Sequence, residues 1–368
     1  MAARVRNAFR SGITLRVAAG SLALAWGGVL HADDVNLMSG TTIKQAIGGR
    51  VKGQVQSESP NEVVVLLGAT TTSVPTDQIQ SIRYDGQSAS FALAEARESS
   101  GQLAESAELF KKAAAESSGK PFPYQAALYR EAAVLTDLAS VEPDRVKDAK
   151  DKLAKFVQAY PAGRHIAGAR SCLARLQLLA GDFTGAEATI AELARLPRGA
   201  ERAAVLRTKI LARQGKHQAA IAELDRLIAG YPKGSERNRA ALLAKAESLA
   251  GMKQFKEAET LLREVIQASA PEDASAQAPA YNTLGDCLRA ANRPKDALIA
   301  YLHTDLLYAK NKEEHPRALH QIAALYRELK QDGRANESAE RLKREYPRSP
   351  WATRRTTEPE TVLKPEKG

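Results

Sequence analysis

The amino-acid sequence predicts a mainly α-helical protein, in which an array of helical hairpins follows a small antiparallel β domain. Three observations support this fold class. Residues 278–304 contain two amphipathic stripes at helical spacing, separated by the break Asn292-Arg293-Pro294. The same pattern recurs within residues 87–351, at intervals of 34 to 41 residues between Gly181 and Gly333. Residues 35–84 instead alternate apolar and polar positions, as strands do.

The hairpin at residues 278–304 shows why an array is needed. Its first stripe consists of Ala280, Leu284, Cys287 and Leu288, and its second of Ala297, Tyr301 and Thr304. Two short amphipathic helices joined by a tight turn cannot bury both of their apolar faces alone. They need similar hairpins on each side, so we expect neighbours with the same pattern.

The neighbours share a small residue five positions after the turn, an apolar residue at nine and a packing residue at twelve. The proposed turn residues are Gly101, Gly181, Gly215, Lys253, Asn292 and Gly333. The small residues that follow them are Ser106, Ala186, Ala220, Ala258, Ala297 and Ser338. A weaker copy has Ala149, Leu153 and Phe156. This recurrence favours a repeat array over an unrelated all-helical bundle.

The pattern resembles the tetratricopeptide repeat (TPR), best at Ala280-Tyr281, Leu284-Gly285, Ala297 and Tyr301. The resemblance covers about residues 89–351. It implies a right-handed α-solenoid of about seven repeats over residues 87–351, in which the first helix of each hairpin lines a concave groove. The chain departs from the family where repeats exceed 34 residues, which implies extended helices or looser turns. The family's proline after the second helix is clear only in Tyr160-Pro161, Leu196-Pro197, Tyr231-Pro232 and Tyr346-Pro347.

The resemblance also implies which residues face the groove. They are Arg170, Gln177, Arg207, Gln214, Lys245 and Tyr281. Arg207 and Lys245 occupy equivalent positions of adjacent repeats, which suits them to a carboxylate. The carboxylate-binding groove of the family also has asparagines at set positions, and these are missing here. A dedicated clamp for a C-terminal carboxylate is therefore not expected, and the six residues also fit an ordinary solubilising role.

Residues 1–32 have the pattern of a secretory signal peptide. Four arginines precede an apolar run over residues 17–30, and Ala32 precedes Asp33. The run is shorter than the roughly 20 residues that a membrane span requires. We therefore expect an exported chain that starts near Asp33, is periplasmic or secreted and has no transmembrane span. An uncleaved anchor is the alternative.

Residues 33–86 are predicted to form a small barrel-like β domain. Val51 and Val55 alternate with polar residues, and a β-branched and aliphatic run occupies residues 62–67. This pattern is similar to the small Sm-like or SH3-like modules that precede repeat arrays in some exported bacterial proteins. At the other end, residues 352–368 are charged and poor in apolar residues, which predicts a disordered tail.

Composition narrows the functional classes. The hydrophobic content is 44% with only 5% aromatic residues, which indicates a core of Ala and Leu. The formal charge is +10, and it falls to +6 without the four arginines of residues 1–32. Such a mild excess permits attraction to polyanions without requiring it. Cys172 and Cys287 lie in apolar helical patterns, so we expect buried free thiols.

The sequence contains no recognisable catalytic, cofactor or metal motif. Gly-x-Ser-x-Gly, Walker, dinucleotide-binding and His-Glu-x-x-His patterns do not occur. The sequence therefore predicts a non-enzymatic interaction scaffold of the periplasm or cell envelope, which binds a partner peptide or helix and no nucleic acid. The alternatives are a module that binds an anionic polymer or the cell wall through a basic surface, and an enzyme subunit.

Overall fold

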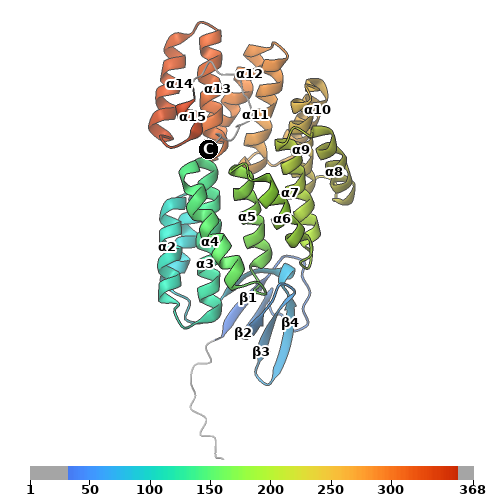
Figure 1. The fold of residues 1–368 in the computed structure, drawn as a ribbon, viewed down its shortest axis with the longest axis vertical. Helices are drawn as coiled ribbons and strands as arrows, with labels where there is room; N and C mark the ends of the chain where they lie inside the picture. The colour runs from blue at the N-terminus through green and yellow to red at the C-terminus, as the bar shows by residue number, and fades with distance from the viewer. Residues whose placement is uncertain (1–31, 355–368) are drawn as a thin grey trace, which may run out of the picture.

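The computed structural model describes residues 32–354, in which a five-stranded sheet precedes an array of helices (Figure 1). The predicted signal peptide, apart from its last residue, lies outside the described residues. So does the predicted tail, apart from residues 352–354. No helix in the described part is both long and apolar enough to cross a membrane.

The N-terminal sheet is antiparallel, with the strand order β4-β3-β2-β1-β5. Its strands are β1 (Asp33–Leu37), β2 (Arg50–Glu58), β3 (Glu62–Leu67), β4 (Thr70–Pro75) and β5 (Ile79–Arg83). The alternating residues Val51, Val55, Val63, Val65 and Val74 are all buried. Side chains on a strand alternate between its two faces, so the pattern places these valines on one buried face.

The sheet is open, which corrects the expected barrel-like closure. β4 and β5 are its two edges, and no pairing between them occurs in the described chain. After β4 a short 3₁₀ helix (Thr76–Gln78) leads the chain away, and β5 then pairs with β1. The sheet is held against the helices instead. Glu58 accepts a hydrogen bond from the Tyr84 hydroxyl at 2.5 Å and lies 3.4 Å from Arg164, which directly precedes the fifth helix.

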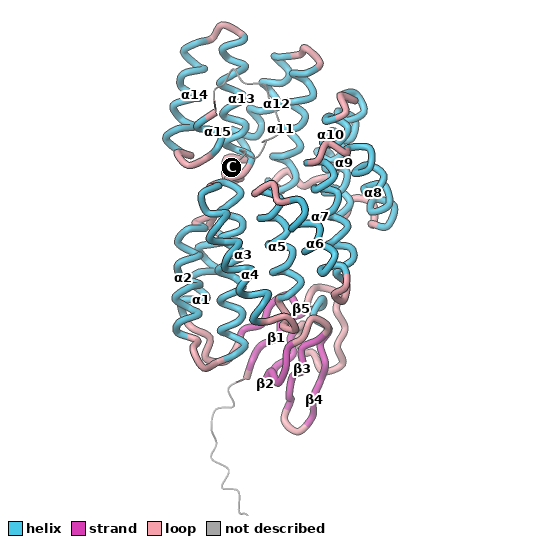
Figure 2. Tube along the Cα trace, viewed as in Figure 1, coloured by secondary structure: helices cyan, strands magenta, loops and turns pink. Residues whose placement is uncertain are grey.

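The described helices form seven consecutive hairpins and a short terminal helix (Figures 1 and 2). The hairpins are α1 (Ala89–Ser99) with α2 (Leu103–Glu116), α3 (Pro121–Val141) with α4 (Val146–Ala159), α5 (Ile166–Leu179) with α6 (Phe183–Ala194), α7 (Gly199–Arg213) with α8 (His217–Gly230), α9 (Glu236–Gly251) with α10 (Phe255–Ala268), α11 (Ala274–Ala290) with α12 (Pro294–Leu307), and α13 (Glu314–Glu328) with α14 (Asp332–Glu345). The terminal helix is α15 (Pro350–Thr353).

The small residues of the repeat pattern lie where the two helices of a hairpin approach each other. Ser106, Ala149, Ala186, Ala220, Ala258 and Ala297 have no exposed surface. In the sixth hairpin, Gly285 of α11 lies directly against the ring of Tyr301 on α12. The predicted packing is therefore confirmed at these positions, because a larger side chain would push the two helices apart.

The tight turns are made by residues in the left-handed conformation, which commonly ends a helix. Positive φ angles occur at Gly101, Gly181, Gly215, Lys253, Asn292 and Lys330. The last of these corrects the predicted turn at Gly333, which lies inside α14. With Lys330 as the turn residue, the small residue five positions later is the fully buried Ala335.

The helices form two layers. The first helices of consecutive hairpins contact one another from α3 through α5, α7, α9 and α11 to α13, so they form the inner layer. The second helices pack mainly on first helices and form the outer layer. The array curls until its two ends meet (Figure 1). Arg348, next to α15, pairs with Glu142 at the end of α3 at 3.0 Å, and a cavity of about 480 Å³ is lined by residues of both ends.

Candidate functional site

Two of the three charged residues predicted to face the groove contact the outer layer. Arg170 of α5 forms an ion pair with Glu192 of α6 at 3.0 Å. Lys245 of α9 forms one with Asp225 of α8 at 2.5 Å. Arg207, at the position equivalent to Lys245, is exposed. Arg170 and Lys245 therefore engage second helices, and a binding role for the three charged residues stays a prediction.

The two predicted glutamines have the same orientation. Gln177 of α5 accepts a hydrogen bond from the Thr189 hydroxyl of α6 at 2.8 Å. Gln214, which ends α7, donates one to Glu187 of α6 at 3.3 Å. Each amide is thus engaged by a second helix, which leaves it less available to a ligand in the groove.

Tyr281 belongs to the packing between α11 and α12. Its ring stacks on His303, with centroids 4.4 Å apart, and on Tyr308 at 6.1 Å. Five of the six predicted groove residues therefore contact a second helix or the residue that caps it. Their role in binding a partner stays an untested prediction.

In the third to sixth hairpins the inner surface is formed by a different helical position, six residues before the left-handed turn residue. We call this the inward position of these four hairpins; it is occupied by Arg175, Lys209, Glu247 and Asp286. Arg175 of α5 pairs with Asp137 of α3 at 3.0 Å, and Asp286 of α11 pairs with Arg317 of α13. Both contacts join one first helix to another. The inward position therefore lies two residues along the helix from Arg207 and Lys245, on a different face.

Four charged side chains of the inner surface form no ion pair or side-chain hydrogen bond with another described residue. They are Lys209 and Arg213 of α7, Glu247 of α9, and Glu313, which caps α13; all four are exposed. We call them the unpaired inner charges. Exposed charges of this kind are balanced only by solvent or by a bound partner.

Glu247 and Glu313 are open to solvent inside the curl, but atoms of several inner helices surround them and reduce their solvation. Burial among the inner helices raises the pKa of Glu247, although Arg317, Lys209 and Arg213 act to lower it. Burial likewise raises the pKa of Glu313, and the charges of Glu314 and Asp137 add to this effect. The helices that influence Glu313 include α3, α5 and α7, so α13 has returned across the axis to face them.

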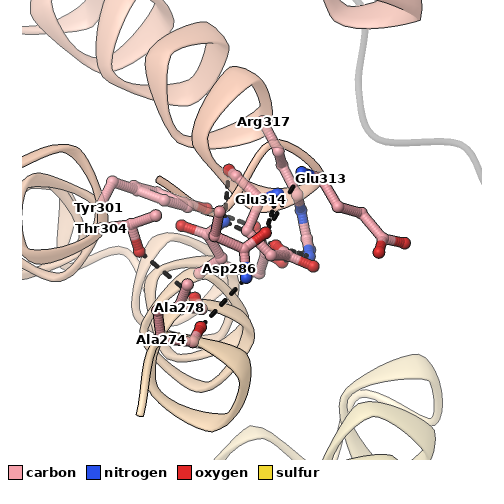
Figure 3. Close-up of polar contacts among 10 residues, drawn as sticks. Ala274, Ala278, Asp286, Tyr301, Thr304, Glu313, Glu314 and Arg317 are labelled. Atoms are coloured by element: carbon pink, nitrogen blue, oxygen red, sulfur yellow. Dashed lines mark hydrogen bonds and ion pairs between the residues drawn. The ribbon is translucent and has the colours of Figure 1, made fainter. Parts of the chain in front are cut away.

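One part of the inner surface is satisfied by its own contacts (Figure 3). Asp286 binds Arg317 and accepts a hydrogen bond from the Tyr301 hydroxyl. Asn282 donates to the backbone carbonyl and to the carboxylate of Glu314 at 2.9 and 2.7 Å. These contacts join α11, α12 and α13 into a fixed wall, so ligand contacts are expected elsewhere along the groove.

The described residues offer little for metal or thiol chemistry. Within residues 32–354 no group of three potential metal-ligating His, Cys, Asp or Glu side chains occurs. Cys172 and Cys287 are buried and free, as the sequence predicts. Burial raises the pKa of the Cys287 thiol to about 12. A thiol with a raised pKa is a poor nucleophile at neutral pH, which fits a packing role.

The geometry so far defines a class: a solenoid of helical hairpins with an inner groove, preceded by a small sheet. Comparison with protein families makes the class specific. Tetratricopeptide repeat models match residues 145–235 and residues 317–349. Both ranges lie within the array, and these parts of it are similar to the tetratricopeptide repeat. No curated protein matches the chain in sequence.

A solved structure shares this fold at low sequence identity, and two others show a weaker likeness. The apo form of the quorum sensor NprR from B. thuringiensis is 13% identical, with 69% of this chain and 74% of that chain covered and a TM-score of 0.51. A tetratricopeptide repeat protein from Parabacteroides merdae is 13% identical over 69% and 91%, with a TM-score of 0.48. A Rap protein complexed with Competence and Sporulation Factor is 12% identical over 72% and 77%, with a TM-score of 0.49.

Proposed function

We propose that the protein is an exported, non-enzymatic scaffold whose inner groove binds a polypeptide partner. The observation that carries this proposal is the set of unpaired inner charges, Lys209, Arg213, Glu247 and Glu313. Most other charged residues of the first helices pair within the array, as Arg175 does with Asp137. Charges kept unpaired in a confined groove suit recognition of a partner, because electrostatic complementarity gives specificity.

Export is supported by the signal pattern of residues 1–32, and a periplasmic or envelope location follows from it. A groove ligand made only of negative charges is disfavoured, because such a polymer would meet Glu247 and Glu313 as well as Lys209 and Arg213. If the protein binds an anionic polymer, we therefore expect the outer surface of the array to bind it.

Site-specific photocrosslinking in the native host tests the proposal. A photoreactive residue at Val205, an exposed position on the inner helix α7, should capture a discrete protein partner. The same residue at Ala222, exposed on the outer helix α8, is the matched control. Equal capture from both positions, or capture from Ala222 alone, would contradict binding in the groove.

The location is tested on the same material. N-terminal sequencing of the protein purified from its host should find a chain that starts near Asp33. A chain that still carries residues 4–30 would contradict the exported soluble form and favour the anchor.

A further inference from the structure

The charge at the inward position changes sign between the fourth and fifth hairpins. Arg175 and Lys209 are basic in the third and fourth hairpins, and Glu247 and Asp286 are acidic in the fifth and sixth. The turn residues of these hairpins share the left-handed conformation, so the four positions are structurally equivalent. Arg213 extends the basic half, and Glu313 adds an acidic side chain that faces Arg175 and Lys209 across the curl.

The two halves face one space without neutralising each other. Glu247 senses the charges of Lys209 and Arg213, yet none of the three forms an ion pair with a described residue. Charged residues of the outer layer behave differently. Arg226 pairs with Glu223, and Arg263 pairs with Glu259, each on its own helix.

We propose that the groove selects a mixed-charge polypeptide segment, whose acidic residues contact Lys209 and Arg213 and whose basic residues contact Glu247 and Glu313. This inference rests on the proposed function and adds the chemistry of the partner. A purely acidic segment would bring like charges together at Glu247 and Glu313, and a purely basic one would do so at Lys209 and Arg213. Such contacts reject the wrong partner as effectively as opposite charges attract the right one.

Three synthetic peptides of equal length serve as probes. They share one Ala-rich sequence whose charged positions are all Glu, all Lys, or a block of Glu followed by a block of Lys. Fluorescence anisotropy with the full chain should give at least about a tenfold lower Kd for the mixed peptide than for either uniform one. The difference should shrink as salt is raised, because salt screens exposed charges.

Two double variants test the assignment of the residues. K209E/R213E makes all four unpaired inner charges acidic, so the preference should shift to the Lys peptide. E247K/E313K makes all four basic, so the preference should shift to the Glu peptide. R226E/R263E makes the same change in net charge as K209E/R213E on the outer layer and should keep the wild-type preference. R207E/K245E should also keep it, because these residues face away from the inner surface.

The inference is overturned if the mixed peptide binds no tighter than both uniform peptides, if no peptide binds, or if all variants keep one preference. Circular dichroism of each variant verifies that the array is folded, which is expected because all substituted side chains except the half-buried Lys245 are exposed. A partner captured from Val205 together with unselective peptide binding would remove only this inference. Failure of capture from Val205 would remove the proposed function itself.

Discussion

At the scale of single residues, the two helices of a hairpin approach closely where one of them carries glycine or another very small residue. Gly285 on α11 meets Tyr301 on α12, whose ring is fully buried and whose hydroxyl binds Asp286. A Cβ atom added at Gly285 would lie 2.6 Å from that ring. The ring is held at its face and at its hydroxyl, so it cannot move aside without losing a contact.

Replacing Gly285 by alanine should therefore destabilise the array by about 1–3 kcal/mol through overpacking. The matched control is Gly333→Ala in α14, where an added Cβ meets no atom within 4 Å. That change should stabilise the helix by about 0.5–1 kcal/mol, because alanine loses less entropy on folding. Urea denaturation of both variants measures the difference. A similar loss in the two would show that the helices do not approach closely at Gly285.

At the scale of elements, the turn residues set the repeat register, because every other repeat position is counted from them. The sequence predicts most of this frame, because glycine marks three of the turns and the buried alanines follow at a fixed distance. It fails at the last turn, since the left-handed residue is Lys330 and the nearby Gly333 is helical. Nothing in the amino-acid sequence shows that Lys330 adopts this conformation.

The unpaired inner charges could not be singled out from the sequence for a related reason. Several stripes of a helix carry charges, and Arg207 and Lys245 match each other as well as the inward residues do. Which stripe faces inward depends on how the helices pack into inner and outer layers, and the sequence pattern does not show this packing. The open sheet was also beyond the sequence, because alternation identifies strands and does not show whether the two edge strands pair.

A prediction at this scale concerns Lys330, whose φ of 59° is costly for a residue with a side chain. Lys330→Gly should stabilise the array by up to about 1 kcal/mol, because glycine adopts this conformation freely. Ala222→Gly, in the exposed interior of α8, should instead cost about 1 kcal/mol. Thermal unfolding of the two variants compares them. Destabilisation by Lys330→Gly would mean that the left-handed turn does not form there.

At the scale of the whole molecule, the curled array creates an interior in which acids are confined. Glu247 and Glu313 lie on different hairpins, and the pKa of each is raised chiefly by burial. Neither hairpin alone would produce this effect, because the surrounding helices come from both halves of the array. The raised pKa values of Glu247 and Glu313 therefore depend on the complete curled array.

The stability of the protein should therefore depend on pH through Glu247. The unfolded state releases this proton near the ordinary pKa of 4.5, whereas the folded state holds it to a higher pH. Stability is consequently lost as pH rises through this window. Glu247→Gln should be more stable than the wild type at pH 7, and the gain should vanish below the ordinary pKa. Urea melts at both pH values measure it.

Asp305 provides a control of opposite sign. Burial opposes its ionisation, but the hydrogen bond from His315 and the charge of Arg341 lower its pKa overall. Asp305→Asn should therefore destabilise the protein at pH 7, and the loss should shrink as pH falls below the ordinary carboxyl range. A pH-independent effect from both variants would show that neither carboxylate differs between the folded and unfolded states.

The contact between Arg348 and Glu142 changes the behaviour of the array as a chain of units. In an open solenoid each repeat depends only on its neighbours, and the terminal repeats fray first. Here residues of one end of the array contact the other end, so neither end is as exposed to solvent as the ends of an open solenoid. Removing the segment from Tyr346 onward would uncover α3 as well as α13, two helices almost the whole array apart in sequence. A truncated chain is therefore not expected to keep the structure that the same residues have in the full-length protein.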